Sequence, residues 1–234
     1  MIRKTSFALL WLGFSIYAFT IAPPSQPDTF DLIIKLSSGQ WDNINPLIVT
    51  LFNLMGIWPM IYAGMALADG VGQKLPAWPF VTLSFGIGAF ALLPYLALRD
   101  SNQTFNAKKS LLLKVVDSPW TGRFLMLGAL ALLGYGTLNG DLAANWNDFI
   151  GQWRISRFIN VMSLDFCMLC AIVSPLLKDD MAKRGLWQTS LGPVLFWIGA
   201  LVPLLGVLFY LSVRPPLREF GKEPDTALSE ASAQ

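Results

Sequence analysis

Residues Asn45 to Gly64 read NPLIVTLFNLMGIWPMIYAG, and this stretch decides the class of fold. It opens an apolar run, Pro46 to Ala68, which as a helix is long enough to cross about 30 Å of hydrocarbon. The run is far longer than a β-strand and lacks the polar–apolar alternation of a membrane barrel strand. It therefore predicts a transmembrane helix, kinked by Pro59.

Five further apolar runs lie on either side of this one: Ser6 to Ala22, Trp78 to Leu98, Phe124 to Leu138, Phe158 to Leu177 and Leu191 to Val213. The run that starts at Phe124 is short, and we expect it to extend back to Trp120, with Arg123 reaching the membrane surface. The sequence thus predicts an all-α integral membrane protein, a bundle of six transmembrane helices in one domain over residues 1–213. Residues 214–234 are expected to form a short, disordered polar tail.

The first run, Ser6 to Ala22, also has the outline of a signal peptide, because Arg3 and Lys4 precede it and small residues close it. A cut after Ala22 would leave proline next to the cleavage site, which peptidases disfavour. We therefore expect this helix to be retained; the bundle has five helices if it is cleaved.

Composition narrows the possible chemistry. Hydrophobic residues make up 54% of the chain and charged residues 14%, whereas a soluble domain carries about 25% charge. The absence of histidine excludes histidine-ligated haem, zinc–histidine sites and histidine-based triads. Two cysteines and a net charge of +2 indicate neither a disulfide framework nor nucleic-acid binding. We predict no catalytic residues, no metal site, no cofactor and no nucleic-acid partner.

Two connecting segments have the composition of helices that lie along a membrane surface. One is Phe30 to Leu36; the other is Lys108 to Val116, where three lysines interrupt an apolar run, although a solvated loop explains this segment equally well. Orientation stays open, because six crossings place eight lysines and arginines on one side and nine on the other. The Arg3–Lys4 start and the dense Arg99–Arg123 cluster both favour the cytoplasm, yet six crossings put them on opposite sides.

A short internal repetition connects the two halves of the chain. FGIGA at Phe85–Ala89 and FWIGA at Phe196–Ala200 lie 111 residues apart. Three-helix halves would run in opposite senses, as in many transporters with inverted repeats. Five similar residues in apolar helices arise easily by chance, and chance is the simpler interpretation.

Asp165 is the residue that most clearly breaks the apolar pattern, because it lies near the middle of the fifth run. A carboxylate at that depth costs several kcal/mol unless it is paired, hydrated or protonated. Either it is a proton, cation or ligand site, or it is a structural group bonded to a neighbouring helix, and it should face the bundle interior in both cases. Asn53, Ser84, Asn160 and Arg157 are its candidate partners, with Asn53 the deepest.

Cys167 and Cys170 form a C-x-x-C within the same run. Reactive pairs of this spacing place one thiol at a helix N-terminus, which lowers its pKa. Here both lie deep in an apolar helix and no second cysteine pair exists to relay electrons, so we interpret them as small buried residues.

NPLIVTLFNLMGIWP at 45–59, LADGVGQKLPAWPF at 67–80 and GAFALLPYLALR at 88–99 together resemble an uncharacterised family of small polytopic membrane proteins from cyanobacteria and plastids. The likeness covers about a quarter of the chain. It implies a location in the thylakoid or plasma membrane of a cyanobacterium and a link with photosynthetic complexes. It supplies no reaction and no catalytic residues.

Two functional hypotheses follow. The first is a non-enzymatic accessory or assembly factor of a larger membrane complex, with the lipid bilayer and that complex as partners. The alternative is a small-solute or ion transporter or channel that uses Asp165, with Asn53 and Arg157 as further polar residues of its path. A membrane enzyme is the least favoured class.

Overall fold

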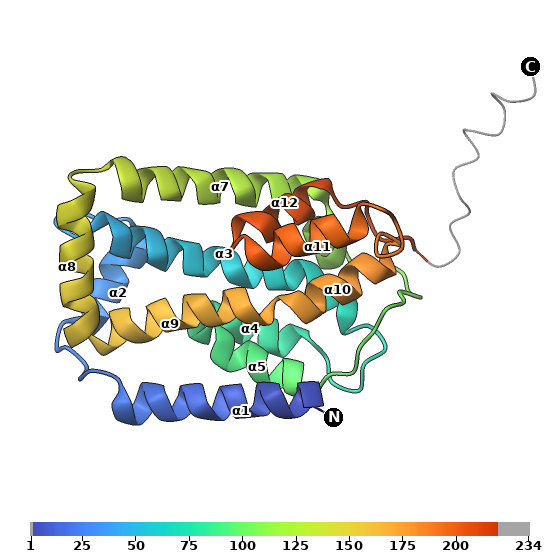
Figure 1. Ribbon diagram of the computed structural model, residues 1–234, viewed down its shortest axis with the longest axis horizontal. Coiled ribbons are helices and arrows are strands. Elements are labelled where there is room, and N and C mark those ends of the chain that lie inside the picture. Colours follow the sequence, from blue (N-terminus) through green and yellow to red (C-terminus); the bar gives the residue numbers. More distant parts are fainter. Residues whose placement is uncertain (1, 220–234) are drawn as a thin grey trace, which may run out of the picture.

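The computed structural model describes residues 2–219, and within this range the chain forms helices and no strands (Figure 1). The elements, in chain order, are α1 (Ile2–Ile16), its π-helical continuation η1 (Tyr17–Ile21), α2 (Thr29–Ser38), α3 (Pro46–Asp69), α4 (Trp78–Ile87), α5 (Ala89–Leu98), α6 (Leu111–Asp117), α7 (Pro119–Leu138), α8 (Leu142–Ile155), α9 (Arg157–Ile172), α10 (Ser174–Lys183), α11 (Gly192–Leu201) and α12 (Leu205–Val213). The prediction of an all-α protein is confirmed.

Four helical segments are long and apolar enough to cross a membrane: Ile2–Ile21, Pro46–Asp69, Pro119–Leu138 and Arg157–Lys183. They match four of the six expected runs, and α7 begins at Pro119, close to the expected extension to Trp120. Local sequence sets where they begin. The Asn45 side chain accepts from the amide of Leu47 ahead of Pro46, and the Ser118 side chain caps α7 ahead of Pro119. These features suggest a membrane protein.

The third and sixth apolar runs do not form single helices, so the prediction of six spanning helices is not confirmed. Each run breaks in the middle and folds back on itself, as α4–α5 and as α11–α12. Gly88 makes the first turn with φ +51° and ψ −127°, a combination that is open to glycine and avoided by residues with a side chain. Leu204 makes the second with φ +61°, an uncommon conformation for a residue with a side chain. A helix of about ten residues spans about 15 Å, half the hydrocarbon thickness.

Both helical hairpins open toward the same end of the molecule. Arg99, at the close of the first hairpin, pairs with Asp69 at the end of α3. Arg214, at the close of the second, pairs with Asp180 near the end of α10. The amino group of Lys4 donates to the Leu98 carbonyl, which puts the start of α1 at this end too. We call this end, which holds residues 2–5, 70–77, 99–118, 184–191 and 214–219, the charged end.

The opposite end is closed by two short helices, α2 and α8, which cross the ends of the long helices (Figure 1). α2 contains the predicted Phe30 to Leu36 helix. α8 was not predicted; Asp141 begins it by accepting from the amides of Ala143 and Ala144. At the charged end, α6 confirms that most of Lys108 to Val116 is helical, with Leu111 and Val115 exposed. Its position along a membrane surface stays a prediction.

The two halves of the chain repeat one plan in the same sense. α1 leads away from the charged end, α2 crosses the far end, α3 returns, and α4–α5 is the hairpin. α7, α8, α9–α10 and α11–α12 repeat these four steps, and α12 packs on α7 as α5 packs on α1. FGIGA contains the first turn, at Gly88, and FWIGA lies in the last part of α11, shortly before the second turn. The inverted arrangement is therefore wrong: the halves are parallel, as in repeats related by an axis along the membrane normal.

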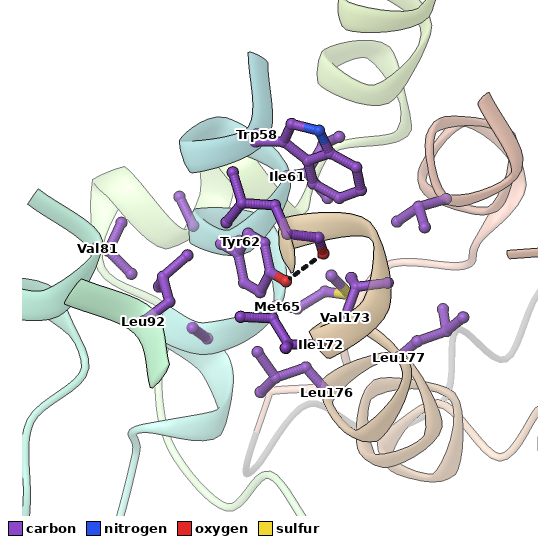
Figure 2. Packing of buried hydrophobic residues seen from close by; sticks show 14 of the residues in the cluster. Trp58, Ile61, Tyr62, Met65, Val81, Leu92, Ile172, Val173, Leu176 and Leu177 are labelled. Atoms are coloured by element: carbon purple, nitrogen blue, oxygen red, sulfur yellow. Dashed lines mark hydrogen bonds between the residues drawn. The ribbon is translucent and has the colours of Figure 1, made fainter. Parts of the chain in front are cut away.

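α3 is the central helix of the bundle and contributes much of the core. Trp58, Ile61, Tyr62 and Met65 are fully buried (Figure 2), and the Tyr62 hydroxyl donates to the Leu169 carbonyl at 2.8 Å. This bond ties α3 to α9 at the level where the helices cross.

The first residues of the expected disordered tail are packed against the bundle. Arg214 and Leu217 are buried against the charged end, and the Leu217 amide donates to Asp117. The rest of that prediction, on residues 220–234, lies outside the described residues. Retention of the first run stays a prediction, and in the structure Lys4 pairs with Asp100 and the Trp11 indole donates to the Phe90 carbonyl.

Candidate functional site

Asp165 faces the bundle interior, as predicted, and is only 5% exposed. Its carboxylate accepts a hydrogen bond of 2.8 Å from the backbone amide of Ala89, the first residue of α5. The first amides of a helix have no partner within that helix, and its N-terminus attracts negative charge. Asp165 therefore caps a helix that begins inside the bundle, and does so from a different helix.

The turn before Ala89 fits around this carboxylate closely. A Cβ added to Gly88 would lie 2.6 Å from the Asp165 Cγ and closer still to an oxygen. Only glycine leaves room for the carboxylate at this turn. Non-helical backbone at membrane depth is tolerated where it is buried in protein, and here Asp165 supplies part of that cover.

The structure does not bring the other candidate residues to Asp165. The Asn53 amide donates to the Val49 carbonyl in its own helix, and Ser84 likewise bonds within α4. Arg157 donates to the Pro23 carbonyl at 2.9 Å, so it anchors the end of the first run instead of reaching along α9. Asn160 accepts from the Tyr17 hydroxyl and donates to the Trp153 carbonyl. The expectation that Asn53 assists Asp165 is wrong, because the partner is a backbone amide.

The cysteine pair also differs from its interpretation as two buried residues. Cys167 is exposed on the outer side of α9 and Cys170 is half-buried, and both are free thiols. Neither lies at the N-terminus of a helix, so the feature that activates thiols in C-x-x-C motifs is missing at both.

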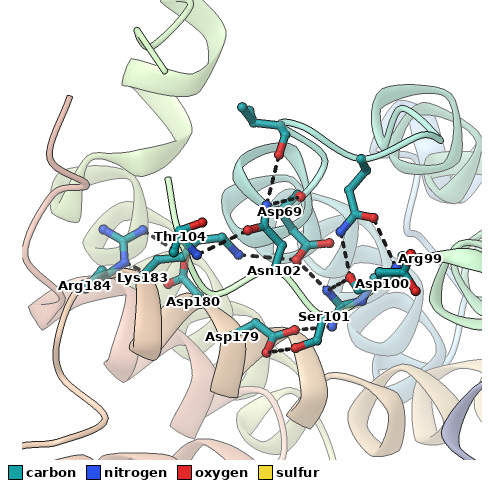
Figure 3. Close-up of polar contacts among 12 residues, drawn as sticks. Asp69, Arg99, Asp100, Ser101, Asn102, Thr104, Asp179, Asp180, Lys183 and Arg184 are labelled. Carbon is teal, nitrogen blue, oxygen red and sulfur yellow. Dashed lines mark hydrogen bonds and ion pairs between the residues drawn. The ribbon is translucent and has the colours of Figure 1, made fainter. Parts of the chain in front are cut away.

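A buried network of ion pairs at the charged end is the main feature that sequence reasoning missed (Figure 3). Arg99 bridges Asp69 of α3 and Asp179 of α10, and all three side chains are almost fully buried. The Tyr95 hydroxyl also donates to Asp69, at 2.6 Å, and Lys183 approaches the same carboxylate at 3.3 Å. One arginine thus joins the end of the first hairpin to both halves of the bundle.

A second buried network lies beside it. Arg184 bridges Asp180 and Asp117, and Arg214 pairs with Asp180 at 2.9 Å. The Tyr210 hydroxyl donates to Asp180 at 2.7 Å. The guanidinium of Arg184 donates also to the Pro215 carbonyl, so this network holds the segment after α12.

The two networks occupy equivalent places in the two halves. Tyr95 and Arg99 belong to YLALR at 95–99, and Tyr210 and Arg214 belong to YLSVR at 210–214. In each case the tyrosine and the arginine, one helical turn apart, reach the same aspartate, Asp69 or Asp180. This repeated Tyr-Leu-x-x-Arg motif is the signal in the sequence that indicates the networks.

The pKa shifts of Asp117 and Arg99 favour the charged forms of these two groups. Burial alone would raise the pKa of Asp117, but the charge of Arg184 and hydrogen bonds from Lys109 and Arg184 lower it below its ordinary value. Burial disfavours the charged form of Arg99, yet Asp69 and Asp179 outweigh this effect and its pKa is raised. The arrangement holds helix ends together; breaking such a buried pair costs about 3–5 kcal/mol.

Two open cavities are found at the charged end. One, of about 320 Å³, lies between Arg3, Lys178 and Phe196; the other, of about 420 Å³, lies between Lys74 and Asn102. Asp165 lines neither of them. Among residues 2–219 no group of three histidine, cysteine or acidic side chains is placed to hold a metal ion.

Comparison with known proteins gives no match for this chain among protein-family models, curated proteins or solved structures.

Proposed function

We propose that this protein is a non-enzymatic accessory or assembly factor that docks within a larger membrane complex. The sequence resemblance points to a photosynthetic complex in the thylakoid or plasma membrane of a cyanobacterium. The roles of Asp165 and of the buried ion pairs in holding helices together support a structural protein. The observation that carries the proposal is the outer face of α7.

That face offers a place where another helix fits. On the inner side of α7, Gly122 and Gly136 are covered by Leu211 and Thr50. On the outer side, a Cβ added to Gly134 would meet nothing within 4 Å. Leu127 and Leu138 lie on the same side and are more than half exposed. A small residue between large apolar ones is the pattern that allows close helix contact in a membrane.

An affinity pull-down from mild detergent, followed by mass spectrometry, tests this proposal. We expect the parent protein to retain a large complex and Gly134→Leu to lose most of it, because the added side chain blocks close approach. Gly151→Leu is the matched control, since Gly151 on α8 also has open space. Recovery of the parent as an isolated monomer or small homo-oligomer would contradict the proposal.

Transport is the second candidate function, and the interrupted helix at Asp165 favours it. α5 begins inside the bundle at Asp165, and transporters bind ions and substrates at helices that are interrupted in this way. Under this candidate, Asp165→Asn abolishes solute or ion flux in proteoliposomes while the fold persists. Unchanged flux in that variant would remove Asp165 from any transport path.

A further inference from the structure

Lysine and arginine are distributed very unequally between the two ends of the molecule. In the described chain the charged end and the adjoining helix ends carry thirteen: Arg3, Lys4, Lys74, Arg99, Lys108, Lys109, Lys114, Arg123, Lys178, Lys183, Arg184, Arg214 and Arg218. The opposite end carries three: Lys35, Arg154 and Arg157. A topology of six crossings would place these residues almost equally on the two sides of the membrane.

The two hairpins produce this change. Because each returns to the end where it entered, the connections before and after it lie together instead of on opposite sides. The Arg3–Lys4 start and the Arg99–Arg123 cluster, whose preferences conflicted under six crossings, now share one end. Positive residues in short loops accumulate on the cytoplasmic side of membrane proteins.

Within the described part of the chain, only part of this positive charge is neutralised by ion pairs. Six of the thirteen residues form ion pairs with carboxylates. Within residues 2–219 the other seven have no carboxylate within 4 Å: Arg3, Lys74, Lys108, Lys114, Arg123, Lys178 and Arg218. The opposite end carries five aspartates against its three basic residues. The excess of free cations therefore lies at one end only.

The 320 Å³ cavity gives this charge a defined place to bind an anion. Arg3 of α1 and Lys178 of α10 line it, together with the polar side chains of Ser101 and Gln103. Phe196 and Pro175 form apolar parts of its wall. Cationic side chains next to an apolar wall match a phosphate headgroup with its acyl chains.

The one carboxylate in the cavity wall does not oppose an anion. Asp179 pairs with Arg99 through one oxygen and accepts from the Ser101 hydroxyl, at 2.7 Å, through the other. Lys178, by contrast, has no carboxylate partner among residues 2–219, and its amino group lies 4.8 Å from the centre of the Trp187 ring. Tryptophan favours the headgroup level of a bilayer.

We infer that the charged end faces the cytoplasm-side leaflet and binds anionic lipid headgroups there, with the Arg3–Lys178 cavity as the seat of a lipid phosphate. Basic pockets between helices on this side of a membrane are suited to such headgroups. The inference does not depend on the proposed docking of α7.

Site-specific labelling tests the orientation. Single cysteines replace Gln40, Thr104, Asn147 and Ser190 in a background that lacks Cys167 and Cys170, and sealed vesicles of both orientations receive an impermeant maleimide. We expect Thr104→Cys and Ser190→Cys to react from the cytoplasmic side, and Gln40→Cys and Asn147→Cys from the other. Labelling of Gln40→Cys and Thr104→Cys from one side, as six crossings require, or a reversed pattern, overturns the inference.

Native mass spectrometry tests the headgroup site, with phosphatidylglycerol or phosphatidylcholine added to the purified protein. We expect phosphatidylglycerol to be retained preferentially, and Lys178→Gln to reduce that retention several-fold. Arg154→Gln, at the opposite end, is the matched control and should bind as the parent does. Equal retention of both lipids, or no effect of Lys178→Gln, overturns the headgroup site. Complete displacement of the lipid by glycerol phosphate would assign the cavity to a soluble phosphate and overturn it as well.

Discussion

The turn at Gly88 supports the sharpest prediction about stability. Gly88→Ala would place a Cβ 2.6 Å from the Asp165 Cγ and would hold alanine at φ +51° and ψ −127°. Overpacking of this kind costs about 1–3 kcal/mol, and a backbone conformation reserved for glycine costs about 1–3 kcal/mol more. If Asp165 moves aside, the charged hydrogen bond to Ala89, worth about 1.5–3 kcal/mol, is lost too. We expect a total loss of about 2–6 kcal/mol.

Gly86→Ala is the control, two residues away in the same hairpin. A Cβ there meets nothing within 4 Å and the backbone is helical. We expect this variant to be unchanged or more stable by up to about 1 kcal/mol, since alanine is the better helix former. Equilibrium unfolding in mixed micelles, followed by tryptophan fluorescence, measures both variants.

A double-mutant cycle separates the clash from the backbone strain. In an Asp165→Ala background the collision disappears and only the strain at position 88 persists. We therefore expect Gly88→Ala to cost about 1–3 kcal/mol less there than in the parent. Equal stability of Gly88→Ala and Gly86→Ala, or strict additivity in the cycle, would refute the proposed packing of the carboxylate against the turn.

Two further predictions concern carboxylates. Asp165→Asn keeps an acceptor for the Ala89 amide and should lower the free energy of unfolding by less than about 1.5 kcal/mol, whereas Asp165→Leu removes the acceptor and should lower it by about 1–3 kcal/mol. Unfolding in micelles compares the two variants, and equal losses of stability would show that the bond is unimportant. The lowered pKa of Asp117 means that its contribution to stability is fully present above its unfolded pKa, near 3.8, and is lost as the pH falls through its lower folded value. Asp117→Asn should therefore be less stable than the parent at pH 7, and the difference should narrow as the pH falls below about 4. A difference that stays constant as the pH falls would contradict the ion pairing.

The sequence was sufficient for the class of fold and for the positions of the apolar segments, because length and hydropathy determine both. It was insufficient for the number of crossings. Trp78 to Leu98 has the length and composition of a spanning helix, and whether it spans or returns depends on one residue, Gly88, and on a carboxylate 77 residues later that covers the turn. Glycine occurs in many straight membrane helices, so the turn carries no local signature.

The candidate site, too, could be predicted only in part from the sequence. The interior position of Asp165 followed from the cost of exposing a carboxylate to lipid. The identity of its hydrogen-bond partner could not be predicted, because a free backbone amide exists only where a helix is interrupted, and the sequence pattern predicted no interruption. The lysine and arginine counts failed for a related reason. The residues were counted correctly, but treating two hairpins as spanning helices assigned three of the five loops to the wrong side.

The two hairpins are held by different means, although they share one plan. A hairpin that stops halfway needs support at its turn, where backbone groups are free, and at its base. The first has both: Asp165 at the turn and Arg99 at the base. The second has no matching carboxylate, because the two halves are offset by 111 residues and the residue that corresponds to Asp165 is Leu54. Its turn uses the strained Leu204, and its base is correspondingly reinforced: Arg214 pairs with Asp180 and donates to the Val116 carbonyl, and Arg184 joins the same network. The repeated Tyr-Leu-x-x-Arg motif is thus the support that both halves keep, and Asp165 is an addition of one half.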